Sequence, residues 1–352
     1  MVSKIEKEEL RGTPAEYRVR IFLSVDLSGS TAFKNSDTGQ DTKDDPTPKW
    51  VRVFQKFYDS FPERFNSCYL QCRTAATEND SCPELWKAVG DELVFCGRVT
   101  SQKSAATALS SFIETLHAYR KELSDQGLSL NLKGAAWLAA FPEPNRAVHL
   151  RRGNQEAFTS ATEELECAAD MEPFNYDFLG KAIDTGFRVA SKATPEKFLL
   201  SVQAARLILN NRGRLGFAHD IRFEKPEELK GVNHGEPYPK LFIDTMDHLP
   251  AKEVRRRERQ LLNGNANNTD HQSLLDYLND YCSLVGTDDI ALPLDDNCEK
   301  PEPPESYLNH KEKILAHFEG EKARAASQET GATHEETSEQ EETLDNPDTL
   351  NP

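Results

Sequence analysis

Asp26 stands at the end of a short apolar stretch and is followed directly by small residues. Residues 21–25 are rich in β-branched and aromatic side chains, which predicts a buried strand that ends at this carboxylate. Next come Ser28-Gly29-Ser30-Thr31, whose backbone N–H groups and hydroxyls can approach a phosphate chain. A hard oxygen ligand beside such a turn indicates a magnesium-bound nucleoside triphosphate. The simpler alternative is a buried strand that ends in a capping aspartate.

A second carboxylate, Asp91, is expected at the turn of a hairpin. Apolar residues flank the Gly90-Asp91 pair within residues 84–96, and this pattern predicts a strand, a tight turn and a second strand. Two carboxylates from neighbouring strand ends are what a pair of magnesium ions needs, and in two-metal sites the ions lie roughly 3.5–4 Å apart. The sequence therefore indicates that Asp26 and Asp91 hold divalent cations together.

Asp177, Asp184 and Arg188 form the third charged group. Residues 180–192 predict a helix, so Asp184 and Arg188 share one of its faces and Asp177 lies just before its start. An alternative is an Asp–Arg pair on a solvent-exposed face.

An aromatic helix is expected after the first strand. Residues 35–48 are polar and predict a loop, after which aromatic residues recur at helical spacing from Trp50 until Pro62 ends the pattern. Such a stripe is typical of a core or a subunit interface. Trp50 is close in sequence to the Ser28–Thr31 turn, so the alternative is that it faces the base of a nucleotide.

The remaining patterns predict alternating helices and strands. We expect a helix over residues 101–123, a strand over 129–141, a strand and a short helix from 198 to 209, and a closing hairpin over 223–244. Together with the first hairpin, this order predicts an α/β (α+β) sandwich with a mixed or antiparallel sheet flanked by helices.

The chain is expected to divide into four parts. These are an N-terminal extension (1–16), a main domain (17–247), a helical extension (248–294) and an acidic, largely disordered tail (295–352). The helical extension should hold a basic helix around Arg255, which is a candidate regulatory surface, and a second helix over residues 271–285. In the tail we expect only a transient helix over residues 307–318.

The main domain should contain an insertion at about residues 142–173, with a short helix around residues 157–169. Arg146, Arg151 and Arg152 lie near its start. They are most simply part of a solvated loop, and gripping a triphosphate is the alternative.

Composition excludes several classes of partner. The 352 residues carry a formal charge of −17, whereas nucleic acids and anionic membranes need a basic footprint. No apolar run reaches the roughly 20 residues of a membrane helix, and the polar start of the chain is unlike a secretory signal, so we expect a cytoplasmic protein. The seven cysteines favour reduced thiols over a disulfide framework, and the spacing of Cys68, Cys72 and Cys82 fits no standard zinc pattern.

Taken together, three motifs over residues 17–245 resemble the catalytic domain of class III nucleotide cyclases, the adenylyl and guanylyl cyclase family. Residues 22–31 (Phe-Leu-Ser-Val-Asp-Leu-Ser-Gly-Ser-Thr) are similar to its first metal motif and residues 87–91 (Lys-Ala-Val-Gly-Asp) to its second. Residues 177–188 (Asp-Phe-Leu-Gly-Lys-Ala-Ile-Asp-Thr-Gly-Phe-Arg) are similar to its substrate and transition-state helix. The three motifs occur in the family's order and spacing.

The resemblance implies a role for each matching residue. Asp26 and Asp91 would hold two Mg²⁺ or Mn²⁺ ions, which activate the ribose 3′-hydroxyl and neutralise charge on the α-phosphate as pyrophosphate leaves. Arg188 would stabilise the transition-state phosphate, and Lys87 and Asp177 fall at the base-recognition positions. The family takes the metal acids from one subunit and the helix groups from the other, which implies a head-to-tail homodimer.

Asp184 departs from the family pattern, which has an asparagine that orients the ribose. An aspartate can still accept a hydrogen bond from a ribose hydroxyl, but it adds negative charge near the phosphates. The first motif and the residues Ile183 to Arg188 also resemble the stand-alone bacterial pyrimidine cyclases of the antiphage system called Pycsar. This narrower resemblance implies that UTP or CTP is converted to cyclic UMP or cyclic CMP. Trp50 could narrow the base pocket against purines.

Two other functions stay open at this point. One is the same chemistry on ATP or GTP, as in adenylate and guanylate cyclases. The other is a catalytically silent cyclase-like dimer that binds a nucleotide or a partner protein.

Overall fold

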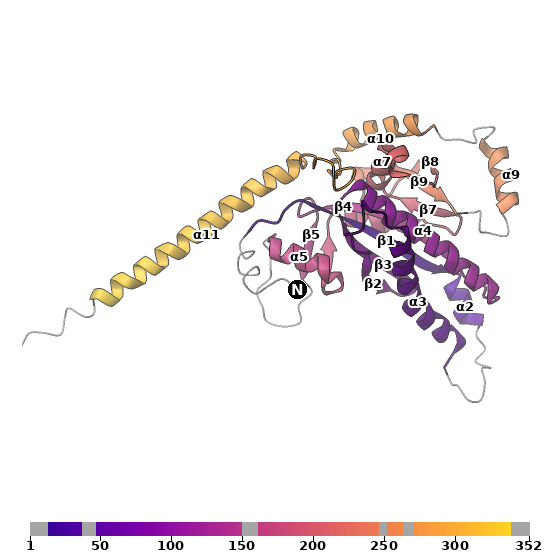
Figure 1. Ribbon diagram of the computed structural model, residues 1–352, viewed down its shortest axis with the longest axis horizontal. Coiled ribbons are helices and arrows are strands. Elements are labelled where there is room, and N and C mark those ends of the chain that lie inside the picture. The colour runs from indigo at the N-terminus through magenta and orange to yellow at the C-terminus, as the bar shows by residue number, and fades with distance from the viewer. Residues whose placement is uncertain (1–12, 37–46, 150–160, 246–251, 264–269, 339–352) are drawn as a thin grey trace, which may run out of the picture.

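A seven-stranded sheet forms the centre of the chain (Figure 1). The computed structural model describes residues 13–36, 47–149, 161–245, 252–263 and 270–338. Across the sheet the strands follow the order β2-β3-β1-β4-β7-β9-β8, and β5 pairs with β6 separately. The strands are β1 (Arg18–Ser28), β2 (Glu84–Val89), β3 (Glu92–Val99), β4 (Asn131–Phe141), β5 (Arg146–His149), β6 (Tyr176–Leu179), β7 (Lys197–Leu200), β8 (Ile221–Glu227) and β9 (Tyr238–Asp244).

The helices cover the sheet and extend beyond it. They are α2 (Ser30–Ser36), α3 (Lys49–Cys72), α4 (Gln102–Asp125), α5 (Glu163–Met171), α6 (Lys181–Ala190), α7 (Val202–Asn210), α8 (Arg212–Leu215), α9 (Lys252–Asn263), α10 (His271–Val285), α11 (Glu305–Ser338) and the short 3₁₀ helices η1 (Pro173–Asn175) and η2 (Asn233–Gly235). Within the described ranges, no helix is both long and apolar enough to cross a membrane.

The central strand β1 pairs antiparallel with both of its neighbours, β3 and β4. The strands β4 and β7 run parallel, while β9 pairs antiparallel with β7 and with β8. This mixed, mostly antiparallel sheet with flanking helices confirms the predicted α/β sandwich. The predicted hairpin is also present, because Val89 pairs with Glu92 across the two-residue turn Gly90-Asp91.

One face of the sheet is covered by α6. Phe22 of β1 stacks on Trp137 of β4 with ring centroids 5.5 Å apart. Gly186 of α6 lies directly over this tryptophan, since a Cβ atom there would come within 2.4 Å of the indole ring. A glycine at this position therefore lets the helix sit close to the sheet.

The opposite face is covered by α3 and α4, which lie against each other (Figure 1). Phe61 and Phe65 of α3 contact Phe95 of β3 and Phe112 of α4. The prediction that Pro62 ends this helix is wrong, because α3 continues to Cys72. Burial of Phe65 and Tyr69 extends the aromatic stripe past the proline and offsets the loss of one backbone hydrogen bond.

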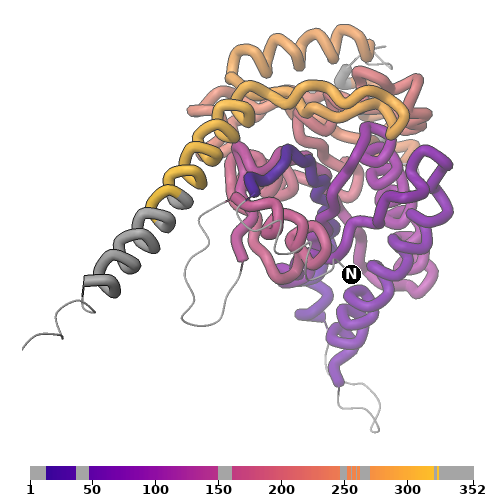
Figure 2. The backbone as a smooth tube through the Cα atoms, turned by 60° about the vertical axis from the view of Figure 1, so that its left-hand side comes forward, coloured from indigo at the N-terminus to yellow at the C-terminus, as the bar shows by residue number. Residues whose placement is uncertain are grey.

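The C-terminal part differs from the predicted disordered tail. The segment after α10 runs across the domain (Figure 2) and is fixed by hydrogen bonds, among them Gln102 N to Pro293 O at 2.8 Å and Lys103 Nζ to Asp295 Oδ2 at 2.9 Å. Helix α11 then begins with Tyr307 buried and its hydroxyl donating to Ala15 O, and extends away from the sheet. These specific anchors order a segment whose average composition alone predicts disorder.

The insertion is tied to β1 by buried arginines. Arg20 donates to Glu166 at 2.7 Å and to Asp170 at 2.8 Å, and Arg18 donates to Asp170 at 2.7 Å. The side chains of Arg20 and Glu166 are 0% and 1% exposed. Helix α5 is thereby fixed against the central strand. It spans residues 163–171, whereas the predicted short helix began near residue 157, in a stretch that lies outside the described residues.

We expect Glu166→Gln to lower the free energy of unfolding by about 3 kcal/mol, because removing one partner of a buried ion pair leaves an uncompensated charge. Urea denaturation measures this change. Glu172→Gln, at an exposed position just after the same helix, is the matched control and should be nearly neutral. Equal stability of the two variants would contradict the assignment.

Candidate active site

Asp26 and Asp91 lie together at one end of β1. In the β1–β3 register Asp26 is opposite Glu92, the residue after Asp91, and the amide of Leu27 donates to Asp91 O at 3.3 Å. Gly90 has φ +64°, a left-handed conformation that favours glycine, and this turn places Asp91 beside the end of β1. The predicted pair of carboxylates from neighbouring strand ends is thus brought together.

Lys133 of β4 is the cation found beside these acids. It lies opposite Asp26 in the register, with 3.5 Å between its Nζ and Asp26 Oδ1. Burial raises the pKa of Asp26, Lys133 opposes this, and the charge of Asp91 adds to it. Burial likewise raises the pKa of Glu92, and the charges of Asp26 and Asp91 raise it further. Three carboxylates thus share one lysine, and the site carries an excess of negative charge.

The predicted phosphate-binding turn follows directly. Ser28 is the last residue of β1, Gly29 has φ +89°, and Ser30 and Thr31 begin α2. A Cβ atom at Gly29 would lie 3.2 Å from Ser129 O, so a larger residue would be strained here on both counts. The small residues are therefore needed for the backbone to turn at this point.

Lys87 and Asp177 form an ion pair within one chain. Lys87 Nζ of β2 donates to Asp177 Oδ1 of β6 at 2.8 Å, and both side chains are 33% exposed. The ammonium also lies 3.7 Å from the centroid of the Trp86 ring. A positively charged donor and a negatively charged acceptor thus lie side by side, and both side chains are partly exposed to solvent.

Asp184 and Arg188 lie on the exposed side of α6. Their neighbours Ile183, Gly186 and Val189 are buried against the sheet, and both charged side chains are exposed. Among the residues that the structure describes, neither side chain has an ion-pair or hydrogen-bond partner. In the described part of the chain, Asp184 and Arg188 therefore do not form the ion pair that was the alternative interpretation.

All three charged groups belong to one face of the sheet. Alternation along β1 puts Asp26 on the same face as Phe22, which is the face that α6 covers. Lys87 of β2 contacts Phe187 of α6 on this face as well. Within the described chain, however, no hydrogen bond or ion pair connects the acids near Asp26 with Asp177, Asp184 or Arg188.

Trp50 is the second residue of α3, in the helix layer of the opposite face. Its ring contacts Phe54 with centroids 5.7 Å apart, and Lys34 of α2 lies 5.9 Å from the indole centroid. The indole is therefore close to the helix that follows the Ser28–Thr31 turn. A contact between Trp50 and the base of a bound nucleotide stays a prediction.

The three arginines near the start of the predicted insertion have different outcomes. Arg146 donates to His310 of α11 at 3.1 Å, whereas Arg151 and Arg152 lie outside the described residues.

Sequence reasoning missed three residues that lie close to Asp26 and Asp91. Glu92 and Lys133 become visible only when the register is known, although Glu92 directly follows Asp91. The hydroxyl of Tyr58 on α3 donates to Gly90 O and so holds the turn that carries Asp91. Nothing in the helical pattern around Tyr58 distinguishes this contact from ordinary core packing.

Comparison with known proteins gives matches among solved structures. No family model and no curated protein matches the chain. The adenylyl cyclase CyaB from P. aeruginosa is 12% identical, over 65% of this chain and 94% of that chain, with a TM-score of 0.44. The guanylyl cyclase Cya2 is 14% identical, over 66% and 93%, with a TM-score of 0.38. The guanylate cyclase domain of RhGC from Catenaria anguillulae, in complex with GTP, is 11% identical, over 66% and 98%, with a TM-score of 0.39. These values establish neither a family nor an activity.

Proposed function

We propose that the chain is a pyrimidine nucleotide cyclase that converts UTP or CTP into the 3′,5′-cyclic monophosphate and pyrophosphate. Its role would be to supply a second messenger in bacterial antiphage defence of the Pycsar type. The observation that carries the cyclase proposal is the placement of three charged groups on one sheet face: Asp26 with Asp91, Lys87 with Asp177, and Asp184 with Arg188. In the reaction the 3′-oxygen bonds to the α-phosphorus, pyrophosphate leaves, and the hydroxyl proton passes to solvent.

The acids near Asp26 fit divalent cations. Besides burial, the charge of Asp91 raises the pKa values of Asp26 and Glu92, whereas Lys133 lowers both and a hydrogen bond with Ser24 lowers that of Glu92. A divalent cation would relieve the mutual repulsion of the three carboxylates. Among the described residues, no three His, Cys, Asp or Glu side chains form a ready metal cluster. A two-carboxylate site suits Mg²⁺ or Mn²⁺, because substrate phosphates and water complete its coordination. When bound, the two ions would supply charge neutralisation at the reacting phosphate.

Lys87 and Asp177 match the edge of a pyrimidine. The ammonium can donate to O4 of uracil while the carboxylate accepts from N3–H. With cytosine the ammonium would donate to N3 and the carboxylate would accept from the N4 amino group. Guanine and adenine present similar edges, so this pair does not discriminate by hydrogen bonding. Base size must then decide. Trp50 is the candidate for this role because its indole lies near Lys34 of α2, the helix that follows the Ser28–Thr31 turn. Its helix α3, however, covers the face opposite to Lys87 and Asp177. Trp50→Ala should widen acceptance toward GTP or ATP, and an unchanged preference would leave Trp50 a packing residue.

Homodimerisation would complete the site. Four large apolar side chains are more than half exposed on elements that adjoin the charged groups: Val89 (54%), Met171 (56%), Phe174 (56%) and Leu179 (51%). The short helix η1, which contains Phe174, contacts both β2 and β6. Exposed apolar side chains gathered on adjoining elements fit a surface that another protein covers.

We expect Leu179→Glu to dissociate the dimer and to lower activity at least about tenfold, because a charge placed in an apolar interface costs more than 1.4 kcal/mol. Analytical ultracentrifugation and turnover measure the two effects. Leu284→Glu, at a site 72% exposed on α10, is the matched control and should stay dimeric and active. A fully active Leu179→Glu monomer would contradict the interfacial site.

The proposal is tested by incubating the purified protein with UTP, CTP, GTP or ATP, with Mg²⁺ and then Mn²⁺. Products are resolved by mass spectrometry, with Asp91→Ala as the blank. Cyclic UMP or cyclic CMP that is absent from the blank supports the proposal. A cyclic purine would replace it with the adenylate or guanylate cyclase alternative. Nucleotide binding without turnover would favour the silent dimer.

A further inference from the structure

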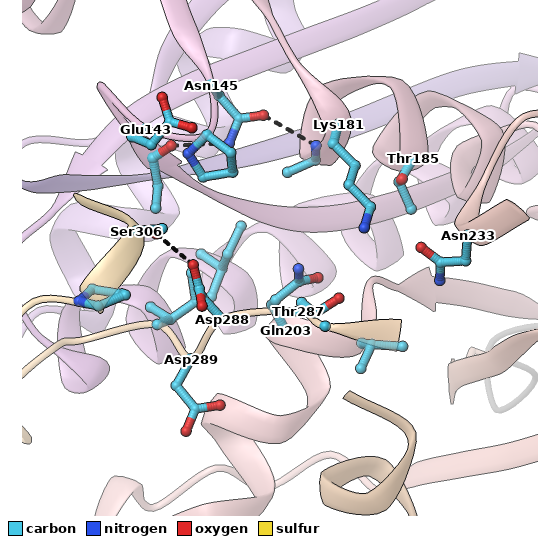
Figure 3. Close-up of a pocket in the computed structure, with 18 of the residues that line it drawn as sticks. Glu143, Asn145, Lys181, Thr185, Gln203, Asn233, Thr287, Asp288, Asp289 and Ser306 are labelled. Carbon is cyan, nitrogen blue, oxygen red and sulfur yellow. Dashed lines mark hydrogen bonds between the residues drawn. The ribbon is translucent and has the colours of Figure 1, made fainter. Parts of the chain in front are cut away.

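A cavity of about 160 Å³ lies at the other end of the sheet (Figure 3). Asp26 is opposite Lys133 in the register, whereas the cavity is lined by Leu138 and Ala140, further along β4. At about 3.3 Å per residue, Ala140 is roughly 23 Å from Lys133. None of the residues assigned above to the metal, the base or the phosphate lines this cavity.

The walls come from segments far apart in the sequence. The beginnings of α6 and α7 form one side, with Lys181, Thr185 and Gln203, and the segment that follows α10 forms another, with Thr287 and Asp288. Leu138, Ala140, Val202 and Ile290 supply apolar surface. Apolar walls with a few convergent polar groups are typical of small-molecule sites.

Two opposite charges of this cavity, both on solvent-exposed side chains, lack a counterion. Lys181 points its ammonium into the cavity (Figure 3), and among the described residues it has no hydrogen-bond or ion-pair partner. Asp288 accepts a hydrogen bond from the neighbouring Ser306 (Figure 3) and forms no ion pair with any described residue. The other acids are compensated, since Asp289 lies 2.6 Å from Arg206 and Glu143 lies 3.6 Å from Arg146.

We propose that this cavity binds a small zwitterion of amino-acid size. The carboxylate of the ligand would bind Lys181, and its ammonium would bind Asp288. The neutral amides of Gln203 and Asn233 and the hydroxyls of Thr185 and Thr287, which Figure 3 shows around Lys181, supply further hydrogen bonds. A cavity of about 150 Å³ accommodates benzene, so the volume suits roughly six to ten heavy atoms and is too small for a nucleoside triphosphate.

Ligand binding here would act on α6. Lys181 and Thr185 belong to the first turns of this helix, and Asp184 and Arg188 lie next to them on its exposed side. A ligand that joins Lys181 to Asp288 would therefore fix the helix against the C-terminal segment. This regulatory consequence rests on the proposed function, whereas the binding itself does not.

Binding is tested on the full chain by thermal denaturation and calorimetry with each of the twenty amino acids, and with acetate and inorganic phosphate as anions that lack an ammonium. At least one amino acid should raise Tm by roughly 3 °C or more at saturation. Lys181→Met and Asp288→Asn should each weaken its affinity at least about tenfold, as loss of a charged hydrogen bond predicts. Lys121→Met and Asp125→Asn, two exposed positions on α4, are the matched controls and should retain it.

Two results would overturn the proposal. One is the absence of any amino-acid-dependent shift in Tm. The other is an equal shift with acetate or phosphate that Asp288→Asn leaves intact, which would make the site a simple anion site. Both results are independent of turnover, so a failed cyclase assay would leave this proposal standing.

Discussion

Replacing Arg188 with alanine should lower kcat for cyclisation by about 10³-fold, with little change in KM. The guanidinium stands exposed on α6 and, among the described residues, makes no ion pair, so it is available to a phosphate. An arginine that neutralises charge in a phosphoryl-transfer transition state contributes about 10³–10⁵ in rate. Because the side chain is exposed, circular dichroism and Tm should stay unchanged. Arg214→Ala, at an exposed position on α8, is the matched control and should keep wild-type turnover.

Mixing two inactive variants tests whether the site is shared between subunits. A heterodimer of Arg188→Ala and Asp91→Asn has one site in which both mutations fall together and one site that is intact. If half of the dimers are mixed, about a quarter of wild-type activity should return. Native mass spectrometry would first show that heterodimers form. If no activity then returned, the acids and the arginine of one site would have to come from the same chain.

The sequence predicts the buried strand β1 and the turn after β2 well because local signals determine them. The Gly90-Asp91 pair between two apolar stretches is a short-range pattern, and the hairpin is confirmed. The apolar run before Asp26 is confirmed as a buried strand, but β1 continues past this carboxylate to Ser28. The error at Pro62 has the opposite origin. Burial of Phe65 and Tyr69 against distant elements overrides the local effect of the proline.

Contacts between distant segments explain what the sequence did not predict. Lys133 stands beside Asp26 only because β4 pairs with β1 in one register, and Tyr58 reaches Gly90 only because α3 packs under the hairpin. The ordered segment after α10 depends on several hydrogen bonds to the first turn of α4 and on one from Ala291 N to the hydroxyl of Tyr17, just before β1. The same limit applies to the cavity near Lys181, since β4, α6, α7 and the segment after α10 must fold together to create it.

Asp26→Asn should remove activity by at least about 10³-fold, because a carboxylate that holds the divalent ions supplies several kcal/mol of charge stabilisation in the transition state. Calorimetry with Mn²⁺ should show that binding to this site is lost. Glu84→Gln, an exposed acid at the start of β2 in the same sheet, is the matched control and should bind Mn²⁺ and turn over normally.

Asp26→Asn should also be more stable than the wild type when no metal is present. Burial, aided by Asp91, raises the pKa of Asp26. Between the ordinary pKa of an aspartate and this raised value the folded state binds more protons than the unfolded state, so stability falls as pH rises through that window. Above it the wild type keeps an unfavourable charge that asparagine lacks. At neutral pH without metal, Asp26→Asn should therefore raise Tm, whereas added Mn²⁺ should raise Tm of the wild type only. A variant that is less stable, or that still gains stability from Mn²⁺, would show that Asp26 serves the fold and not the metal.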